Sequence, residues 1–117
     1  MREYTDQLST QEWLENVKFN QDGLVVAIAQ DWQNHAILMQ AWMSRESLNE
    51  TLSTKRVCYW SRSRRQLWRK GETSGHEQTL VEAYVDCDGD TLLLKVKQKG
   101  PACHTLKPTC FFKKLDI

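Results

Sequence analysis

The stretch Thr79–Gln98, TLVEAYVDCDGDTLLLKVKQ, decides the fold of this chain. Its two ends, Thr79–Asp86 and Thr91–Gln98, alternate apolar and polar side chains, a pattern that predicts two half-buried strands. Gly89 lies between them, where a glycine favours a turn. Because a short turn joins antiparallel neighbours, the stretch predicts a β-hairpin.

Similar patterns upstream predict further strands and two helices. Strands are expected at Leu24–Gln30, Ala36–Met43, Arg56–Ser61 and Gln66–Lys70. Ser9 and Glu12 have capping-box spacing and predict a short helix that carries Trp13, Leu14 and Val17. Ser44 is expected to cap a second helix, Arg45–Leu52. The sequence therefore predicts an α+β fold, with a mostly antiparallel β core of about six short strands and two short helices.

The 117 residues are expected to form a single domain, with an N-terminal helical segment at 1–20 and a catalytic core at 21–113. The net charge of +1 gives no electrostatic argument for a nucleic-acid or membrane partner. No apolar run approaches the roughly 20 residues that cross a bilayer, and the polar N-terminus is unlike a signal peptide. These features predict a cytoplasmic protein whose thiols stay reduced.

Cysteines in a reducing compartment favour metal ligands or core residues over disulfides. Cys87, Cys103 and Cys110 follow one another without a CxxC pair, which excludes zinc fingers, ribbons and knuckles. Three thiolates would leave one zinc position open for water, although scattered cysteines also serve as small buried hydrophobes. His104 beside Cys103 is a candidate fourth ligand or proton shuttle, or a surface-loop histidine. Cys58, within an alternating strand, is interpreted as a packing residue.

Three carboxylates surround the first of these cysteines. Asp86, Asp88 and Asp90 alternate along the chain, and on an extended backbone their side chains would share one face. Hard oxygen ligands suit Mg²⁺ or Ca²⁺, whereas a solvated acidic turn is the equally weighted alternative. An EF-hand is excluded, because Thr91 and Lys97 stand where that loop needs Gly and Glu.

A basic stretch with hydroxyl and glycine residues runs from Trp60 to Gly75, WSRSRRQLWRKGETSG. Arginines and hydroxyls on a strand–turn–strand segment are suited to bind phosphates. The tryptophans Trp60 and Trp68 leave open single-stranded nucleic-acid binding by base stacking. A solvent-exposed charged hairpin is the third interpretation.

These motifs, together with GPACHT at Gly100–Thr105 and with Cys110-Phe111, resemble the phosphoribosyl-AMP cyclohydrolase family of histidine biosynthesis. The resemblance runs from about Asp22 to Phe112, although Leu106, Thr109 and His76 depart from the family's usual pattern. It implies hydrolytic opening of the N1–C6 bond of 1-(5-phosphoribosyl)-AMP by a zinc-activated water, in a form without a fused second activity.

The resemblance also implies the site residues. Zinc, one ion per subunit, would be held by Cys87 of one subunit and by Cys103 and Cys110 of the other in an intertwined homodimer. Magnesium would be held by Asp86, Asp88 and Asp90. His104 is the first candidate for proton transfer and His76 the second. The hypothesised substrate-binding residues are Ser61, Arg62, Ser63, Arg64, Trp68, Arg69, Lys70, Thr73 and Ser74. The partners expected are therefore a nucleotide substrate and a second copy of the chain, with neither nucleic acid nor membrane.

Two other classes of function remain open from the residues. A metal-stabilised module for single-stranded nucleic acid would use the tryptophans and arginines, and its binding would depend steeply on salt. A zinc-stabilised dimer without catalysis would need a closed site with four ligands, to which His104 or Cys58 would have to contribute.

Overall fold

The computed structural model describes residues 5–117, which form six strands and two helices. The strands are β1 (Leu24–Asp31), β2 (Ile37–Ser44), β3 (Cys58–Ser61), β4 (Gln66–Arg69), β5 (Gln78–Val85) and β6 (Thr91–Gln98). The helices are α1 (Thr10–Glu15) and α2 (Arg45–Thr54). The predicted α+β class and the predicted elements are therefore confirmed, with boundaries that shift by a few residues.

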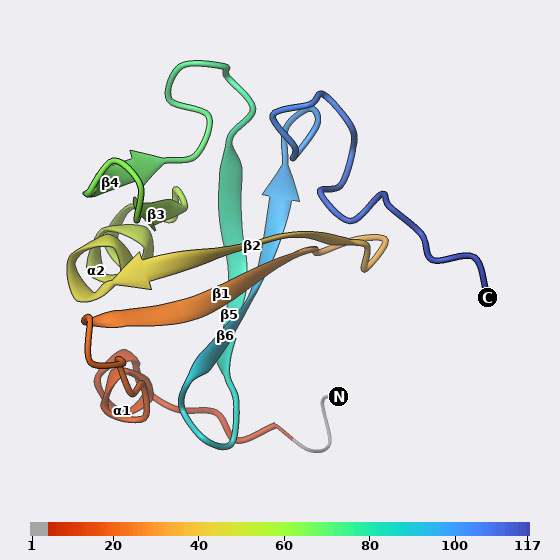
Figure 1. Cartoon of the computed structure of the whole chain (residues 1–117). Helices are drawn as coiled ribbons and strands as arrows, with labels where there is room; N and C mark the ends of the chain where they lie inside the picture. Colours follow the sequence, from red (N-terminus) through yellow and green to blue (C-terminus); the bar gives the residue numbers. More distant parts are fainter. Residues whose placement is uncertain (1–4) are drawn as a thin grey trace.

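All six strands form one sheet in the order β4-β3-β2-β1-β6-β5. Every neighbouring pair is antiparallel except β1 and β6, which run parallel, so the sheet is mixed. The alternating pattern could not reveal this pair, because β1 and β6 are joined by a long crossover rather than a short turn. The hairpin predicted from the opening stretch is confirmed as β5 and β6. In Figure 1, β5 and β6 run across the direction of β1 and β2, so the sheet is strongly twisted.

Both helices begin at the predicted caps. Ser9 and Glu12 form a reciprocal capping box at α1. Ser44 caps α2, and Ser47 completes a second capping box there. Val17, which was expected on the first helix, lies beyond its end, where its backbone N–H donates to Leu14 O at 3.1 Å and its side chain is buried.

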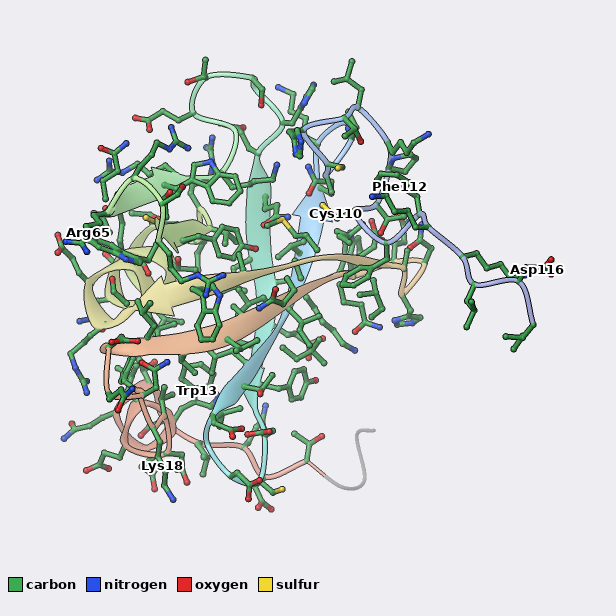
Figure 2. The ribbon with its side chains drawn as sticks, viewed as in Figure 1. Trp13, Lys18, Arg65, Cys110, Phe112 and Asp116 are labelled. Atoms are coloured by element: carbon green, nitrogen blue, oxygen red, sulfur yellow. The ribbon has the colours of Figure 1, made fainter. Side chains whose placement is uncertain are left out.

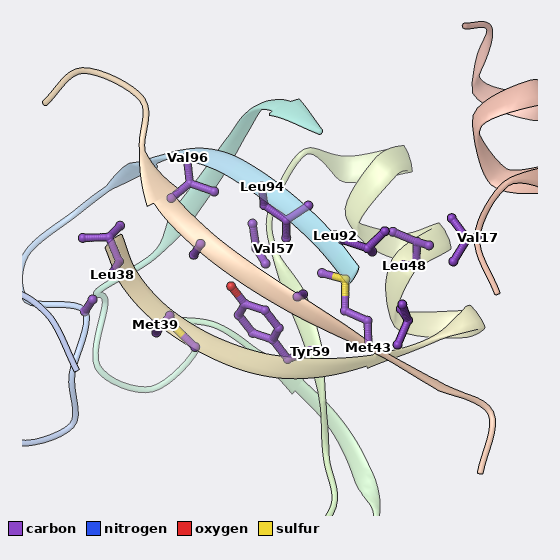
Figure 3. Packing of buried hydrophobic residues seen from close by; sticks show 14 residues of the cluster. Val17, Leu38, Met39, Met43, Leu48, Val57, Tyr59, Leu92, Leu94 and Val96 are labelled. Carbon is purple, nitrogen blue, oxygen red and sulfur yellow. The ribbon is translucent and has the colours of Figure 1, made fainter. Parts of the chain in front are cut away.

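The core packs against the sheet, and α2 contributes Leu48 to it. Leu92, Leu94 and Val96 alternate along β6 and are fully buried. Together with Met43 and Leu48, they pack into the cluster seen in Figure 3. Burying such side chains stabilises the fold by about 1.5–3 kcal/mol each.

A buried hydrogen-bond network that includes Tyr59 and Gln78 lies within this core. The Tyr59 hydroxyl donates to Gln78 Oε1 at 2.7 Å, and the Gln78 amide donates to Gln98 Oε1 at 2.8 Å. The pKa of Tyr59 is strongly raised, mainly because the side chain is buried.

Neither helix within residues 5–117 has the length and apolar character needed to span a membrane.

Candidate functional site

Cys103 and Cys110 come together in the irregular segment that follows β6. The segment folds back on itself, because Cys103 N–H donates to Lys107 O at 3.2 Å. Cys110 is fixed against β2, since its N–H donates to Leu38 O at 2.8 Å. Thr109 adds to this attachment by donating its hydroxyl to Ile37 O at 2.6 Å. Figure 2 shows Cys110 at the end of the sheet that lies away from Lys18.

The two thiols have different electrostatic surroundings. The Thr105 hydroxyl donates to Cys103 Sγ at 3.0 Å, and this hydrogen bond is the main cause of a lowered Cys103 pKa. Desolvation raises the pKa of Cys110 to about 11, with a further contribution from its hydrogen bond to Cys103. The two shifts therefore come mainly from Thr105 and from desolvation, and the contact between the thiols adds a smaller contribution to each. The chemistry of the pair suits a soft metal such as zinc.

Lys70 brings a positive charge next to the pair. Its ammonium donates to Ala102 O at 2.8 Å, one residue before Cys103. Burial lowers the pKa of Lys70, and the charges of Cys110 and Cys103 oppose that shift. The side chain therefore ties the strand-end segment carrying Gly71 to the loop carrying Cys103.

Cys87 lies far from the other two cysteines of the same chain. It sits in the turn between β5 and β6, whereas Cys103 follows the far end of β6 (Figure 1). An eight-residue strand spans about 26 Å, so one chain cannot bring all three thiols to one ion. Consistent with this, no group of three or more His, Cys, Asp or Glu side chains within residues 5–117 is placed to hold a metal.

The three aspartates occupy the same exposed turn as Cys87. The expectation that they share one strand face is wrong, because β5 ends at Val85 and the backbone turns at Gly89, with φ +78°. Asp86 stabilises the turn by accepting hydrogen bonds from Asp90 N–H at 3.1 Å and Thr91 N–H at 3.3 Å. Within residues 5–117, the three carboxylates are therefore not placed to hold one cation together, although their oxygens are of the type that Mg²⁺ prefers.

The segment just after α1 also contacts this acidic turn. Lys18 N–H donates to Gly89 O at 2.7 Å, and a Cβ on Gly89 would lie 2.2 Å from Asn16 O. The chain just after α1 therefore packs directly on the acidic turn, and only glycine fits at this contact.

A cavity of 430 Å³ opens beside Cys103. Both predicted histidines line it, His104 from the loop after β6 and His76 from the loop before β5. His76 is positioned by close packing, because a Cβ on Gly100 would lie 2.6 Å from its imidazole. Gly71 makes the loop possible, since its φ is +82° and a Cβ there would meet Glu77 N at 2.5 Å. The residues that were predicted to bind substrate and that line this cavity are Arg64, Trp68, Arg69, Lys70, Thr73 and Ser74.

A second cavity of 550 Å³ adjoins the first and contains the remaining predicted residues, Ser61, Arg62 and Ser63. Arg64 and Trp68 line both cavities. Arg69 is already engaged, because its Nε and Nη2 donate to the Glu50 carboxylate at 2.7 and 2.9 Å. Within one chain, the structure thus gathers Cys103, Cys110, both histidines and the basic stretch.

Two residues of the site, Thr105 and Trp42, could not be identified from the sequence. Thr105 acts on Cys103 through a hydrogen bond that follows from the loop conformation, and no spacing indicates it. Trp42 lines the second cavity, where the Arg62 guanidinium lies 4.8 Å from its ring centroid. A tryptophan in an alternating strand carries no signal that separates a core role from this one.

Known proteins with similar sequences identify the family of this chain. The family model for phosphoribosyl-AMP cyclohydrolase matches residues 39–112. The chain belongs to the phosphoribosyl-AMP cyclohydrolase family. A phosphoribosyl-AMP cyclohydrolase of Alcanivorax borkumensis is 58% identical over 110 residues, which cover 94% of this chain and 78% of that protein. One of Bordetella avium is 58% identical over 106 residues, covering 90% and 79%. The resemblance seen in the sequence is therefore confirmed, and the matched range includes both cavities and all three candidate zinc ligands.

Proposed function

We propose that this protein is a phosphoribosyl-AMP cyclohydrolase, which hydrolyses the N1–C6 bond of 1-(5-phosphoribosyl)-AMP in histidine biosynthesis. The observation that carries the proposal is the thiol pair Cys103 and Cys110, of which Cys103 lines a cavity together with both histidines and several cationic side chains. Family membership supports the substrate, since the related proteins carry this name.

The proposed zinc site needs two chains. Cys103 and Cys110 would hold the ion together with Cys87 of the partner subunit, because the chain's own Cys87 lies one strand length away. These three cysteines would hold the zinc, and the ion would supply the chemistry of an activated water at neutral pH. The proposal therefore includes a homodimer, with Mg²⁺ at Asp86, Asp88 and Asp90, and a cytoplasmic location.

The reaction requires proton transfers that the histidines can perform. Addition of water at C6 of the ring turns the exocyclic imine into an amine and leaves a hydroxyl on C6. When the N1–C6 bond breaks, C6 becomes a carboxamide, the hydroxyl loses its proton and N1 gains one. His104 and His76 line the same cavity, so one would accept the hydroxyl proton while the other donates to N1.

The cationic side chains of the cavity would bind and orient the substrate. Lys70, Arg64 and the hydroxyl of Thr73 are suited to hold phosphate through charge-assisted hydrogen bonds. Holding the substrate at two anionic ends would place the purine beside Cys103 and limit its freedom to move.

The test is an ultraviolet assay of ring opening with phosphoribosyl-AMP, on protein whose zinc content is measured. Cys110→Ser should lose both zinc and turnover. Cys58→Ala is the matched control, because it removes a buried thiol outside the cavities and should keep both. Full turnover by zinc-depleted Cys110→Ser protein would contradict the mechanism. No turnover by zinc-replete wild type, together with salt-sensitive binding to single strands, would favour the nucleic-acid alternative.

A further inference from the structure

The second cavity carries positive charge only. It is lined by Arg62 and Arg64, and none of its other lining residues is acidic. Within residues 5–117, the ion pairs of arginine are Arg56 with Glu77 and Arg69 with Glu50, so neither arginine of this cavity has a carboxylate partner. Two unneutralised guanidinium groups in one hollow are suited to bind a phosphate.

The same cavity is aromatic. Trp42, Trp60 and Trp68 line it, and the Arg62 guanidinium is held 4.8 Å from the Trp42 ring centroid. A guanidinium that rests on an aromatic face is preorganised, so less conformational freedom is lost when it binds an anion. Ser61 adds order to the turn, because its hydroxyl accepts from Arg64 N–H at 3.3 Å.

Trp68 and Arg64 join the two cavities, because both residues line each of them. The Trp68 ring is fixed in place by Tyr59, with centroids 5.5 Å apart. A fixed aromatic ring at the junction of two cationic hollows is suited to stack a purine that carries a phosphate arm on each side.

The chemistry of the substrate indicates which cavity binds the phosphoribosyl arm on N1 and which binds the arm on N9. C6 and N1 are bonded to each other, so the arm on N1 starts beside the reacting atom, whereas the arm on N9 leaves from the opposite ring of the purine. Cys103 and His104 line the first cavity and not the second.

Resting on the proposed function, we infer that the first cavity binds the phosphoribosyl arm on N1, and that the second cavity binds the ribose phosphate of the AMP moiety through Arg62. The substrate thus lies across Trp68 with its N1 side toward the first cavity and its N9 side toward the second. AMP, which lacks the N1 arm, occupies the second cavity and the junction alone.

The test compares two ligands and three variants. AMP binding is measured by calorimetry, and KM and kcat are measured with phosphoribosyl-AMP. Arg62→Gln should weaken AMP binding and raise KM, each about tenfold, with little change in kcat, because it removes charge-assisted hydrogen bonds to one phosphate. Thr73→Val, in the first cavity, should raise KM about fivefold and leave AMP binding unchanged. Arg65→Gln is the charge-matched control, because Arg65 lies in the same turn and lines neither cavity.

Two results would overturn the inference. If Thr73→Val weakens AMP binding and Arg62→Gln does not, the substrate lies in the opposite direction. If Arg62→Gln is as silent as Arg65→Gln, the second cavity binds no phosphate. A wild-type protein that binds AMP with the predicted Arg62 dependence but does not open the ring would refute the proposed function and retain the nucleotide site.

Discussion

Gly89→Ala tests how strongly the acidic turn depends on the chain after α1. The change adds a Cβ at φ +78°, which costs about 1–2 kcal/mol for an L-residue in the left-handed region. That Cβ would also lie 2.2 Å from Asn16 O, so the two segments must separate. Losing the hydrogen bond from Lys18 N–H to Gly89 O costs about 0.5–1.5 kcal/mol more. The expected destabilisation is therefore about 1.5–3.5 kcal/mol.

The assay is urea unfolding followed by tryptophan fluorescence. Gly23→Ala is the matched control, because Gly23 has φ +75° but a Cβ there meets nothing within 4 Å. The control should lose about 1–2 kcal/mol, from the backbone conformation alone. Equal losses in Gly89→Ala and Gly23→Ala would refute the idea that the two segments are locked together. Since Asp88 and Asp90 flank Gly89, the same variant should also need more Mg²⁺ for turnover.

Three further predictions concern two buried groups and one half-buried lysine. Tyr59→Phe should cost about 1–3 kcal/mol in unfolding experiments, because Gln78 Oε1 loses its buried donor. The free energy of unfolding should fall as pH rises above 9. The Cys58 thiol ionises near its ordinary pKa of 9.0 in the unfolded chain, whereas burial raises its pKa to about 12 in the folded chain. Cys58→Ala should make this decline shallower when unfolding is measured across the pH range. Lys70→Met should release zinc at a lower chelator concentration, because the hydrogen bond to Ala102 O that supports the cysteine loop is lost.

Each of these predictions has a contradicting outcome. Tyr84→Phe, whose exposed hydroxyl donates to Glu82, is the control for the buried tyrosine, and an equal loss in both variants would refute the role of burial. A Cys58→Ala protein with an unchanged alkaline decline would assign that decline to other groups. Unaltered zinc release from Lys70→Met would show that the loop keeps its geometry without the lysine.

The fold was predictable where local pattern determines structure. The alternation in β5 and β6 and the caps at Ser9 and Ser44 were visible in the sequence, because both depend on residues a few positions apart. The parallel pairing of β1 with β6 was not, because it depends on how a long crossover returns to the sheet.

The same division applies to the site. The sequence named both histidines and the basic residues that line the cavities, because residue types and order carry that information. It could not show that Arg69 is paired with Glu50 or that Thr105 donates to Cys103, since these contacts depend on side-chain positions in the folded chain. The extended geometry expected at Asp86–Asp90 was wrong, because the turn at Gly89 outweighs the alternation.

The most direct test of the shared zinc centre is complementation between two inactive variants, Cys87→Ser and Cys110→Ser. A mixed dimer, purified through a different affinity tag on each chain, would contain one site with all ligands intact and one with both defects. A zinc centre shared between subunits predicts no ring opening by either variant alone and about half of wild-type turnover by the mixed dimer, as expected for a two-fold symmetric pair of shared sites. A mixed dimer as inactive as its parents, with zinc bound at neither site, would contradict the shared centre.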